Sequence, residues 1–286
     1  MGRWALILGA SSGFGAAASR ALASRGFDIC GLHLDRRATL PQAEAVAEDV
    51  RALGQRALLF NKNAADARIR ASVLEELESH LDASSDKVTV VLHSLAFGSL
   101  RPYLPDSSET SDNPTLMDAK AMAMTLDVMA HSLVYWVQDL LEKGLLALPG
   151  ARVLALTSAG ASTAWPSYGA VSAAKAALEA HCRQLALELG PRGGTANALC
   201  AGACDTPALR KIPNWQALLA DAGARNPSGR TTTPEDVAQV ITLLCRPEAA
   251  WINGAVIPVD GGEGIAGLPR STAATQNTPE GEPHGR

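Results

Sequence analysis

Near its start the chain reads Leu6-Ile7-Leu8-Gly9-Ala10-Ser11-Ser12-Gly13-Phe14-Gly15. The apolar run predicts a strand and the residues after it predict a helix, so three glycines mark a strand-to-helix junction. A diphosphate bound at such a junction needs close approach to the backbone, free amide donors and the positive end of a helix dipole. Side chains on the glycines would obstruct that approach. We therefore interpret this stretch as a nucleotide-binding loop, with a purely structural turn as the alternative.

The rest of the chain continues the alternation that this stretch begins. Strand-length apolar runs occupy residues 3–8, 29–34, 57–60, 88–93, 151–157, 195–200 and 255–259. Segments of helical periodicity lie between or beside them, at 14–25, 41–53, 67–81, 117–143, 168–189 and 234–245. This rhythm predicts the α/β class: a single Rossmann-type domain with a doubly wound parallel sheet of about seven strands and helices on both faces. We expect the domain to span residues 1–267, and residues 268–286, which have almost nothing apolar to bury, to form a disordered tail.

Composition and charge narrow the class of partner. The 286 residues carry a formal net charge of -4 without a basic block, so the chain has no electrostatic footprint for nucleic acid or an anionic membrane. The apolar run at the N-terminus is too short to span a bilayer and has no cleavable leader, so we expect a cytoplasmic protein. The 6 histidines lack the spacing of a metal site, and no metal is expected. The 5 cysteines are expected to be reduced packing residues, although Cys200 and Cys204 flank a loop near the nucleotide and leave a reactive thiol open.

The end of the second strand bears on the choice of nucleotide. An acid there would bind the adenosine ribose hydroxyls, whereas basic groups would favour a 2'-phosphate. His33 stands where the acid is expected, and Arg36 and Arg37 follow it. The sequence therefore predicts NADP(H), while Asp35 leaves NAD(H) possible and a solvated turn is the alternative for the two arginines.

Tyr168 and Lys175 begin the long helical segment 168–189. At about 100° per residue, seven residues return to the same helix face two turns later, roughly 10 Å along the axis, so the two long side chains can converge on one site. A lysine beside a phenol favours the phenolate, and the phenol can donate a proton or a hydrogen bond to a developing oxyanion. Alone, such a pair is an ordinary helix surface. Behind a nucleotide-binding loop, it indicates a reductase.

These motifs together resemble the short-chain dehydrogenase/reductase superfamily, over residues 3 to about 265. The glycine loop is similar to the T-G-x-x-x-G-x-G fingerprint, with Leu8 in place of threonine. Tyr168 and Lys175 have the Tyr-x6-Lys spacing of the branch that resembles enoyl-acyl-carrier-protein reductases; most carbonyl reductases have Tyr-x3-Lys, and here that tyrosine position is Val171. Three further segments are similar to the enoyl reductases: His93-Ser94-Leu95-Ala96-Phe97, Asp127-Val128-Met129 (with Met129 where carbonyl reductases have a catalytic asparagine) and Ala201-Gly202-Ala203-Cys204-Asp205-Thr206.

The resemblance implies a reaction and a set of functional residues. Hydride would pass from NADPH to the C2=C3 double bond of an enoyl thioester carried by acyl-carrier protein or coenzyme A. The implied catalytic residues are Tyr168, Lys175 and Ser158. The implied cofactor-binding residues are Gly9, Ser11, Ser12, Gly13, Phe14, Gly15, His33, Arg36, Arg37, Asn63, Ala64, Ser94, Leu95, Ala96, Lys175, Gly202 and Thr206.

Ser158 keeps another reaction open. Many enoyl reductases have a second tyrosine ten residues before the first, whereas carbonyl reductases have a serine there, as this chain does. A carbonyl reductase or alcohol dehydrogenase is therefore the competing interpretation, and a non-catalytic cofactor sensor is a third. The resemblance also implies a homo-oligomer, a dimer or tetramer, formed through the helices around 117–143 and 168–189. We expect apolar residues of 207–225 (Leu209, Ile212, Trp215 and Leu218) to cover the acyl chain, and residues 106–115 to be an insertion near the substrate entrance.

Overall fold

A seven-stranded, entirely parallel sheet forms the centre of the protein, in the order β3-β2-β1-β4-β5-β6-β7. The computed structural model describes residues 2–82, 86–105 and 115–267. The strands are β1 (Arg3–Leu8), β2 (Phe27–His33), β3 (Ala57–Asn61), β4 (Lys87–His93), β5 (Arg152–Ser158), β6 (Thr195–Ala201) and β7 (Val256–Val259). The central strands read as continuous apolar runs because both of their faces are covered. The predicted fold class is confirmed, including the number of strands.

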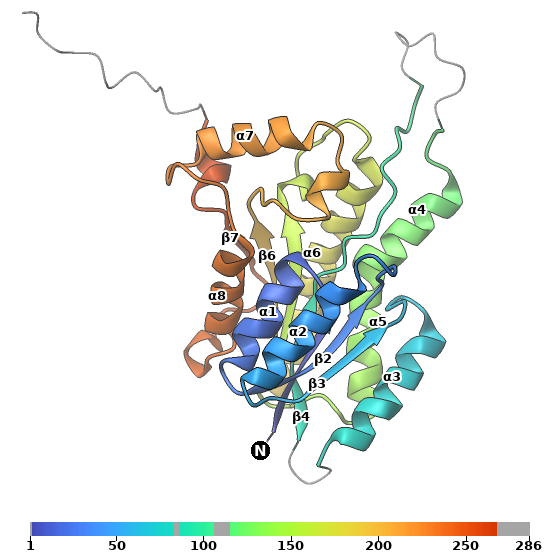
Figure 1. Cartoon of the computed structure of the whole chain (residues 1–286), viewed down its shortest axis with the longest axis vertical. Helices are drawn as coiled ribbons and strands as arrows, with labels where there is room; N and C mark the ends of the chain where they lie inside the picture. Colours follow the sequence, from blue (N-terminus) through green and yellow to red (C-terminus); the bar gives the residue numbers. More distant parts are fainter. Residues whose placement is uncertain (1, 83–85, 106–114, 268–286) are drawn as a thin grey trace, which may run out of the picture.

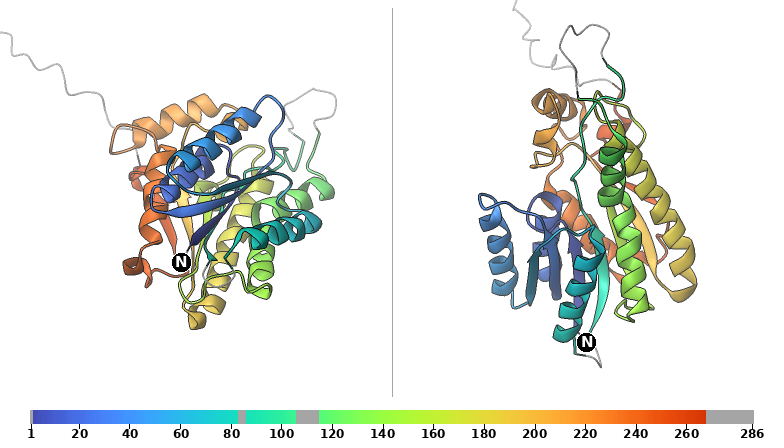
Figure 2. Two further views of the ribbon diagram at one scale, coloured as in Figure 1. Left: turned by 60° about the horizontal axis from the view of Figure 1, so that its bottom comes forward. Right: turned by 90° about the vertical axis from the view of Figure 1, so that its right-hand side faces the viewer.

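Helices cover both faces of this sheet (Figures 1 and 2). One face carries α1 (Gly13–Ala23), α2 (Leu40–Ala52) and α8 (Pro234–Leu244), and α1 packs on both of the others. The other face carries α3 (Ala67–His80), α4 (Ala119–Leu126), α5 (Ser132–Glu142) and α6 (Gly169–Leu189). The start of α8 is fixed by a capping box between Thr233 and Asp236, with Pro234 at the first helical position. The strand order reverses between β1 and β4, which is where such sheets bind ligands at the carboxyl ends of the strands.

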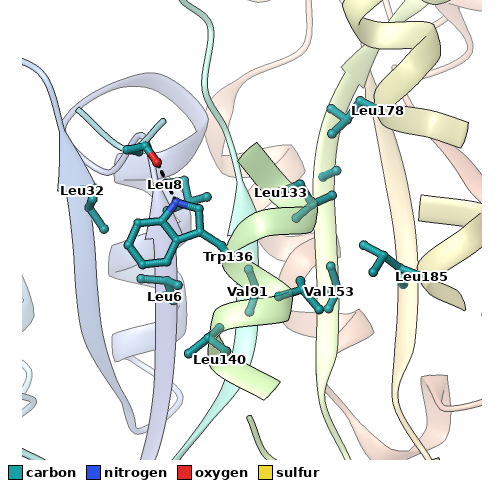
Figure 3. Close-up of a cluster of buried hydrophobic side chains, with 14 of the residues drawn as sticks. Leu6, Leu8, Leu32, Val91, Leu133, Trp136, Leu140, Val153, Leu178 and Leu185 are labelled. Carbon is teal, nitrogen blue, oxygen red and sulfur yellow. Dashed lines mark hydrogen bonds between the residues drawn. The ribbon is translucent and has the colours of Figure 1, made fainter. Parts of the chain in front are cut away.

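The larger hydrophobic cluster lies between the sheet and α5 and α6 (Figure 3). Trp136 is its largest member on α5 and is fully buried, against Leu6, Leu8 and Val91 of the sheet. Burying an indole leaves its N–H in need of a partner, and here Nε1 donates to the Ala64 carbonyl at 2.8 Å. The core thus holds in place the loop after β3, which contributes to the site described below.

Two features of the chain differ from the sequence-based expectation. The predicted helix 117–143 is interrupted by a π-helix, η1 (Asp127–His131), which separates α4 from α5. Residues 215–225, expected only as an apolar cover, form a further helix, α7 (Trp215–Arg225), which lies across the carboxyl end of the sheet in Figure 1. The predicted tail 268–286 and residues 106–114 of the predicted insertion lie outside the described residues. No described helix has the length and apolar character needed to cross a membrane.

Candidate active site

One cavity of about 590 Å³ opens at the carboxyl ends of the strands. Its walls come from the loops after β1, β2, β3, β4, β5 and β6, from the first turns of α6, and from the segment that contains α7. These loops are far apart in the sequence. The parallel sheet brings them to one edge, so the cavity is a direct consequence of the topology.

The glycine-rich stretch forms one wall in a way that requires glycine. Gly9 has φ +94°, and a Cβ there would lie 2.6 Å from the Ser94 carbonyl oxygen. A Cβ on Gly15 would lie 1.9 Å from the Gly9 carbonyl oxygen. The α1 helix that follows has Ser12 as its N-cap residue without a side-chain cap, and no acid in its first turn. Its first amide groups and the positive end of its dipole therefore face the cavity uncompensated, which suits a diphosphate.

Tyr168 and Ser158 face each other across Gly160. A Cβ on Gly160 would lie 2.6 Å from Cε1 of Tyr168 and 3.3 Å from Oγ of Ser158, so only glycine lets both side chains approach. Trp165 packs edge-on against the Tyr168 ring, with the ring centroids 5.2 Å apart. Ser158 Oγ is buried and makes no hydrogen bond to any described residue. Such an atom is costly to bury unless a ligand satisfies it.

Burial decides the protonation state of Tyr168. Desolvation raises the pKa of this phenol, and the nearby Ser158 hydroxyl opposes the shift only in part, although the two groups do not reach hydrogen-bond geometry. The expectation that the lysine favours a phenolate is therefore not met in this state of the protein. Tyr168 carries its proton at neutral pH and is equipped to donate it.

Lys175 lies on α6 with its ammonium group inside the protein. It is 7% exposed, and Nζ donates to the Leu156 carbonyl at 2.6 Å, next to the end of β5. Burial lowers the pKa of Lys175 to about 8, with Glu179 among the groups that oppose the shift. The side chain lines the same cavity as Tyr168. A buried ammonium with one carbonyl partner has N–H donors left for a ligand.

His93, at the end of β4, supports the wall beneath Lys175. It is fully buried, and Nε2 lies 3.0 Å from Ser132 Oγ, which itself donates to the Val128 carbonyl at 2.9 Å. Since the serine proton is used, His93 must carry its own proton on Nε2. Burial, followed by the charge of Lys175, lowers the pKa of His93 to about 3. The imidazole is therefore neutral at every working pH and adds no positive charge to the site.

The loop after β6 forms the wall of the cavity next to the glycine-rich loop. A Cβ on Gly13 would lie 3.3 Å from Cγ2 of Thr206, so this loop touches the glycine-rich loop across the cavity. Gly202 is enclosed by Thr232 and Glu263, and the amide of Ala203 donates to Glu263 Oε2 at 2.9 Å. Burial raises the pKa of Cys200 to about 11 and that of Cys204 to about 12. A reactive thiolate is therefore not available in this loop.

Most residues singled out from the sequence meet at this cavity. The following line it: Gly9, Ser11, Ser12, Gly13, Phe14, His33, Asn63, Ala64, Ser94, Leu95, Ala96, Ser158, Tyr168, Lys175, Gly202 and Thr206. Gly15 is packed behind the loop, and Arg36 and Arg37 are exposed residues that do not line it. Of the four apolar residues expected to cover an acyl chain, Leu209, Ile212 and Leu218 line the cavity, whereas Trp215 packs near the Arg210 guanidinium.

Several residues in or beside the cavity wall were not among those predicted from the sequence. Trp165 and Gly160 shape the surroundings of Tyr168, and an aromatic residue just before a catalytic tyrosine would have been a usable hint. Asp221, Arg225 and Glu263 contribute charges to the wall under α7. Their role depends on how α7 folds over the sheet, which the sequence pattern did not reveal.

The glycine-rich loop, the uncapped start of α1 and the Tyr168–Lys175 pair around one cavity define a dinucleotide-dependent oxidoreductase of the short-chain dehydrogenase/reductase class. The family can be stated more closely. A sequence model described as enoyl-(acyl carrier protein) reductase matches residues 9–263, and the chain belongs to this family.

Individual relatives agree with that assignment and also show its breadth. The chain is 41% identical over 120 residues to an NADH enoyl-acyl-carrier-protein reductase, FabI, of Escherichia coli; the match covers 42% of this chain but only 46% of that relative's length. For the corresponding enzyme of Aquifex aeolicus, the identity is 28% over 195 residues, 68% of this chain and 69% of that one. Its crystal structure superposes with a TM-score of 0.77 at 23% identity, covering 93% and 98% of the two chains. An NADPH-dependent aldehyde reductase-like protein of Arabidopsis thaliana is 29% identical over 271 residues, 91% of this chain and 94% of its own.

The predicted preference for NADP(H) is wrong. The E. coli and A. aeolicus relatives are both named as NADH enzymes. The physical reason lies at the end of β2, where Arg36 and Arg37 are exposed and neither lines the cavity. The group that is held there is Asp35, whose carboxylate lies 2.8 Å from Nδ1 of the cavity-lining His33. Burial alone would raise the pKa of Asp35. The net effect is a lowered pKa, because the carboxylate accepts hydrogen bonds from the hydroxyls of Thr39 and Ser11 and from the His33 ring, so Asp35 remains ionised.

Proposed function

We propose that this protein reduces the C2=C3 double bond of an enoyl thioester, with NADH as the hydride donor and acyl-carrier protein or coenzyme A as the acyl carrier. The observation that carries the proposal is a protonated, buried Tyr168 in the same cavity as the apolar side chains Leu209 and Ile212. Of the chain's three tyrosines, only Tyr168 lines the cavity, and Val171 stands where a carbonyl reductase would have its phenol. The family assignment over residues 9–263 supports the same reaction.

Each residue has a task that its surroundings suit. The bound dinucleotide would supply the hydride for the β-carbon of the enoyl group. Tyr168 would donate a hydrogen bond to the thioester oxygen as negative charge develops there, because its raised pKa keeps the phenol protonated. Ser158, whose buried hydroxyl lacks a partner, would provide a second hydrogen bond to that oxygen. Lys175 would bind the nicotinamide ribose and add positive charge beside the enolate.

The choice of NADH rests on the charge at the end of β2. A carboxylate tied to His33 and the glycine-rich loop accepts hydrogen bonds from ribose hydroxyls and repels a 2'-phosphate. The backbone of Asp35 is fixed as well, because its N–H donates to Asn61 Oδ1 at 2.9 Å and its carbonyl accepts from Asn61 Nδ2 at 3.0 Å. The acid is therefore held in place before the nucleotide binds.

Reduction of a ketone is the second candidate, and two observations favour it. Ser158 stands where carbonyl reductases have a serine, and the Arabidopsis relative, which matches 91% of the chain, is named for aldehyde reduction. Against it stands Met129, a buried thioether on the cavity wall where such enzymes have a catalytic asparagine. The two reactions differ in substrate, so a direct assay separates them.

The assay follows the loss of nicotinamide absorbance with purified protein and crotonyl-CoA, with either NADH or NADPH. We expect turnover of the enoyl thioester, with kcat/KM for NADH at least about tenfold above that for NADPH because the Asp35 carboxylate beside His33 would repel the extra phosphate. A panel of ketones and aldehydes under the same conditions is the control. Turnover of a ketone together with no turnover of any enoyl thioester would refute the proposal in favour of carbonyl reduction.

The pKa of Lys175 predicts how cofactor use depends on pH. Because burial lowers this pKa from 10.5 to about 8, the ammonium is lost as the pH rises through about 8. Above that value, we expect kcat/KM for NADH to fall by about tenfold per pH unit, since this parameter reports the free enzyme. The pKa of Tyr168 is raised above 10 and does not interfere. The measurement is a pH series from 6.5 to 9.5 at a fixed crotonyl-CoA concentration well below its KM, with Lys175→Arg as the permanently charged comparison; a flat profile in the native protein would contradict the assignment.

A further inference from the structure

The part of the cavity wall that α7 forms changes from apolar to charged from one turn of the helix to the next. Leu218, Asp221 and Arg225 all line the cavity, and their spacing of three and four residues places them on one face of α7. Leu218 continues the apolar wall made by Leu209 and Ile212. Asp221 follows about 4.5 Å further along the helix axis. The apolar surface that α7 offers to an acyl chain therefore ends after Leu218.

The charged end of this wall is built from several elements. Arg225 Nε donates to Asp221 Oδ2 at 2.8 Å, and Arg225 Nη2 lies 3.9 Å from Glu263 Oε1 in the turn after β7. The Glu263 side chain is 14% exposed, and its other oxygen accepts the Ala203 amide. Oε2 of Glu263 thus accepts a hydrogen bond from the loop after β6, while Oε1 lies near Arg225 on α7.

The turn that carries Glu263 is held in place by several hydrogen bonds. Asp260 accepts from the amides of Gly262 and Gly264 at 2.9 and 2.8 Å. The buried Asn226, directly after α7, donates to the Asp260 carbonyl at 2.7 Å. The end of α7 and the turn after β7 are thereby held together. A ligand that extends past Leu218 along α7 meets charged side chains, of which Glu263 is 14% exposed, Arg225 29% and Asp221 57%.

Building on the proposed enoyl reduction, we propose that Asp221, Arg225 and Glu263 form the polar end of the acyl pocket and select short acyl chains. Methylene groups pressed against these side chains would displace water without offering hydrogen bonds in return, which is costly for ionised groups. A short enoyl chain stops at the apolar surface around Leu218 and avoids that cost. Chain length is therefore limited by desolvation of an ion cluster.

The test compares crotonyl-CoA with trans-2-dodecenoyl-CoA, below its micellar concentration, in the NADH assay. We expect kcat/KM of the native protein to be at least about tenfold higher for the four-carbon substrate. In the variant Asp221→Leu/Arg225→Met/Glu263→Gln, the ratio of dodecenoyl to crotonyl kcat/KM should rise about tenfold; the glutamine keeps an oxygen for the Ala203 amide. Gln216→Leu, on an exposed position of α7 outside the cavity wall, adds apolar surface elsewhere and should leave the ratio unchanged.

The outcomes separate this inference from the proposed function. Absence of turnover with enoyl thioesters of every length contradicts the enoyl reductase assignment itself. Turnover that is as efficient with dodecenoyl-CoA as with crotonyl-CoA, or a ratio that the triple variant leaves unchanged, overturns only the chain-length inference. If the triple variant does not fold, as judged by circular dichroism, Glu263→Gln alone must raise the same ratio at least twofold, and an unchanged ratio there overturns the inference equally.

Discussion

Replacing Tyr168 by phenylalanine should lower kcat for crotonyl-CoA by about 10²- to 10⁴-fold, which is the usual contribution of a positioned proton donor. The ring and its packing on Trp165 and Gly160 are kept, so only the hydroxyl is removed. No other tyrosine lines the cavity to replace it. Affinity for NADH, measured by fluorescence titration, should change by no more than a few-fold.

Tyr103→Phe is the matched control. Tyr103 packs against Gly169 at the start of α6 but does not line the cavity, so loss of its hydroxyl should change kcat by less than about twofold. A Tyr168→Phe protein with native turnover would remove the phenol from the mechanism. It would also revive the interpretation of the protein as a cofactor sensor, which needs the fold and the glycine-rich loop but not the phenol.

The second large effect is expected at Gly15. An alanine there places Cβ 1.9 Å from the Gly9 carbonyl oxygen, a clash with backbone that no side-chain rotation relieves. Either α1 or the loop must move, and both belong to the proposed diphosphate site. We expect NADH binding to weaken by at least about 100-fold and the free energy of unfolding to fall by about 1–3 kcal/mol, the usual range for overpacking.

Gly267→Ala provides the comparison for Gly15→Ala. No atom lies within 4 Å of a Cβ at Gly267, so the same change of residue type should leave both NADH binding and urea unfolding as in the native protein. Binding by isothermal calorimetry and unfolding by circular dichroism measure the two effects separately. If Gly15→Ala bound NADH with native affinity, the loop could not be the diphosphate site.

The sequence predicted the sheet well because parallel strands covered on both faces leave a strong pattern. All seven strands appear within about two residues of their expected bounds, and β1 matches at both ends. The glycine-rich loop was predictable for a related reason. Only a strand-to-helix junction with close backbone contacts needs glycines at this spacing, and Gly9 and Gly15 make such contacts with Ser94 and with each other.

The choice of cofactor was not predictable from residue types alone. Arg36 and Arg37 have the chemistry to bind a phosphate, but the turn after β2 leaves both exposed. The ionised group held by His33 is Asp35, which the sequence offered only as the alternative that left NAD(H) possible. The direction of a side chain after a strand ends depends on loop contacts, such as those between Asp35 and Asn61, which no local pattern records.

The protonation of Tyr168 and the charged end of the proposed acyl pocket could not be predicted from the sequence, for a different reason. The sequence placed Tyr168 and Lys175 on one helix face, but it could not show that burial raises the pKa of the phenol, opposed only by Ser158. Nothing in the sequence distinguishes Asp221, Arg225 and Glu263 from ordinary surface charges. They become a site only because the turn after β7 packs against α7, a contact between segments about forty residues apart.

The π-helix Asp127–His131 also affects how this chain is compared with others. A π-turn accommodates one residue more than an α-turn, so every side chain after it is rotated by about 100° relative to an uninterrupted helix. Ser132 reaches His93, and Trp136 reaches Ala64, only in that rotated register. An alignment with a relative whose helix is regular therefore requires a one-residue gap within 127–131. Without that gap, the two sequences would pair residues that face directions about 100° apart around the helix.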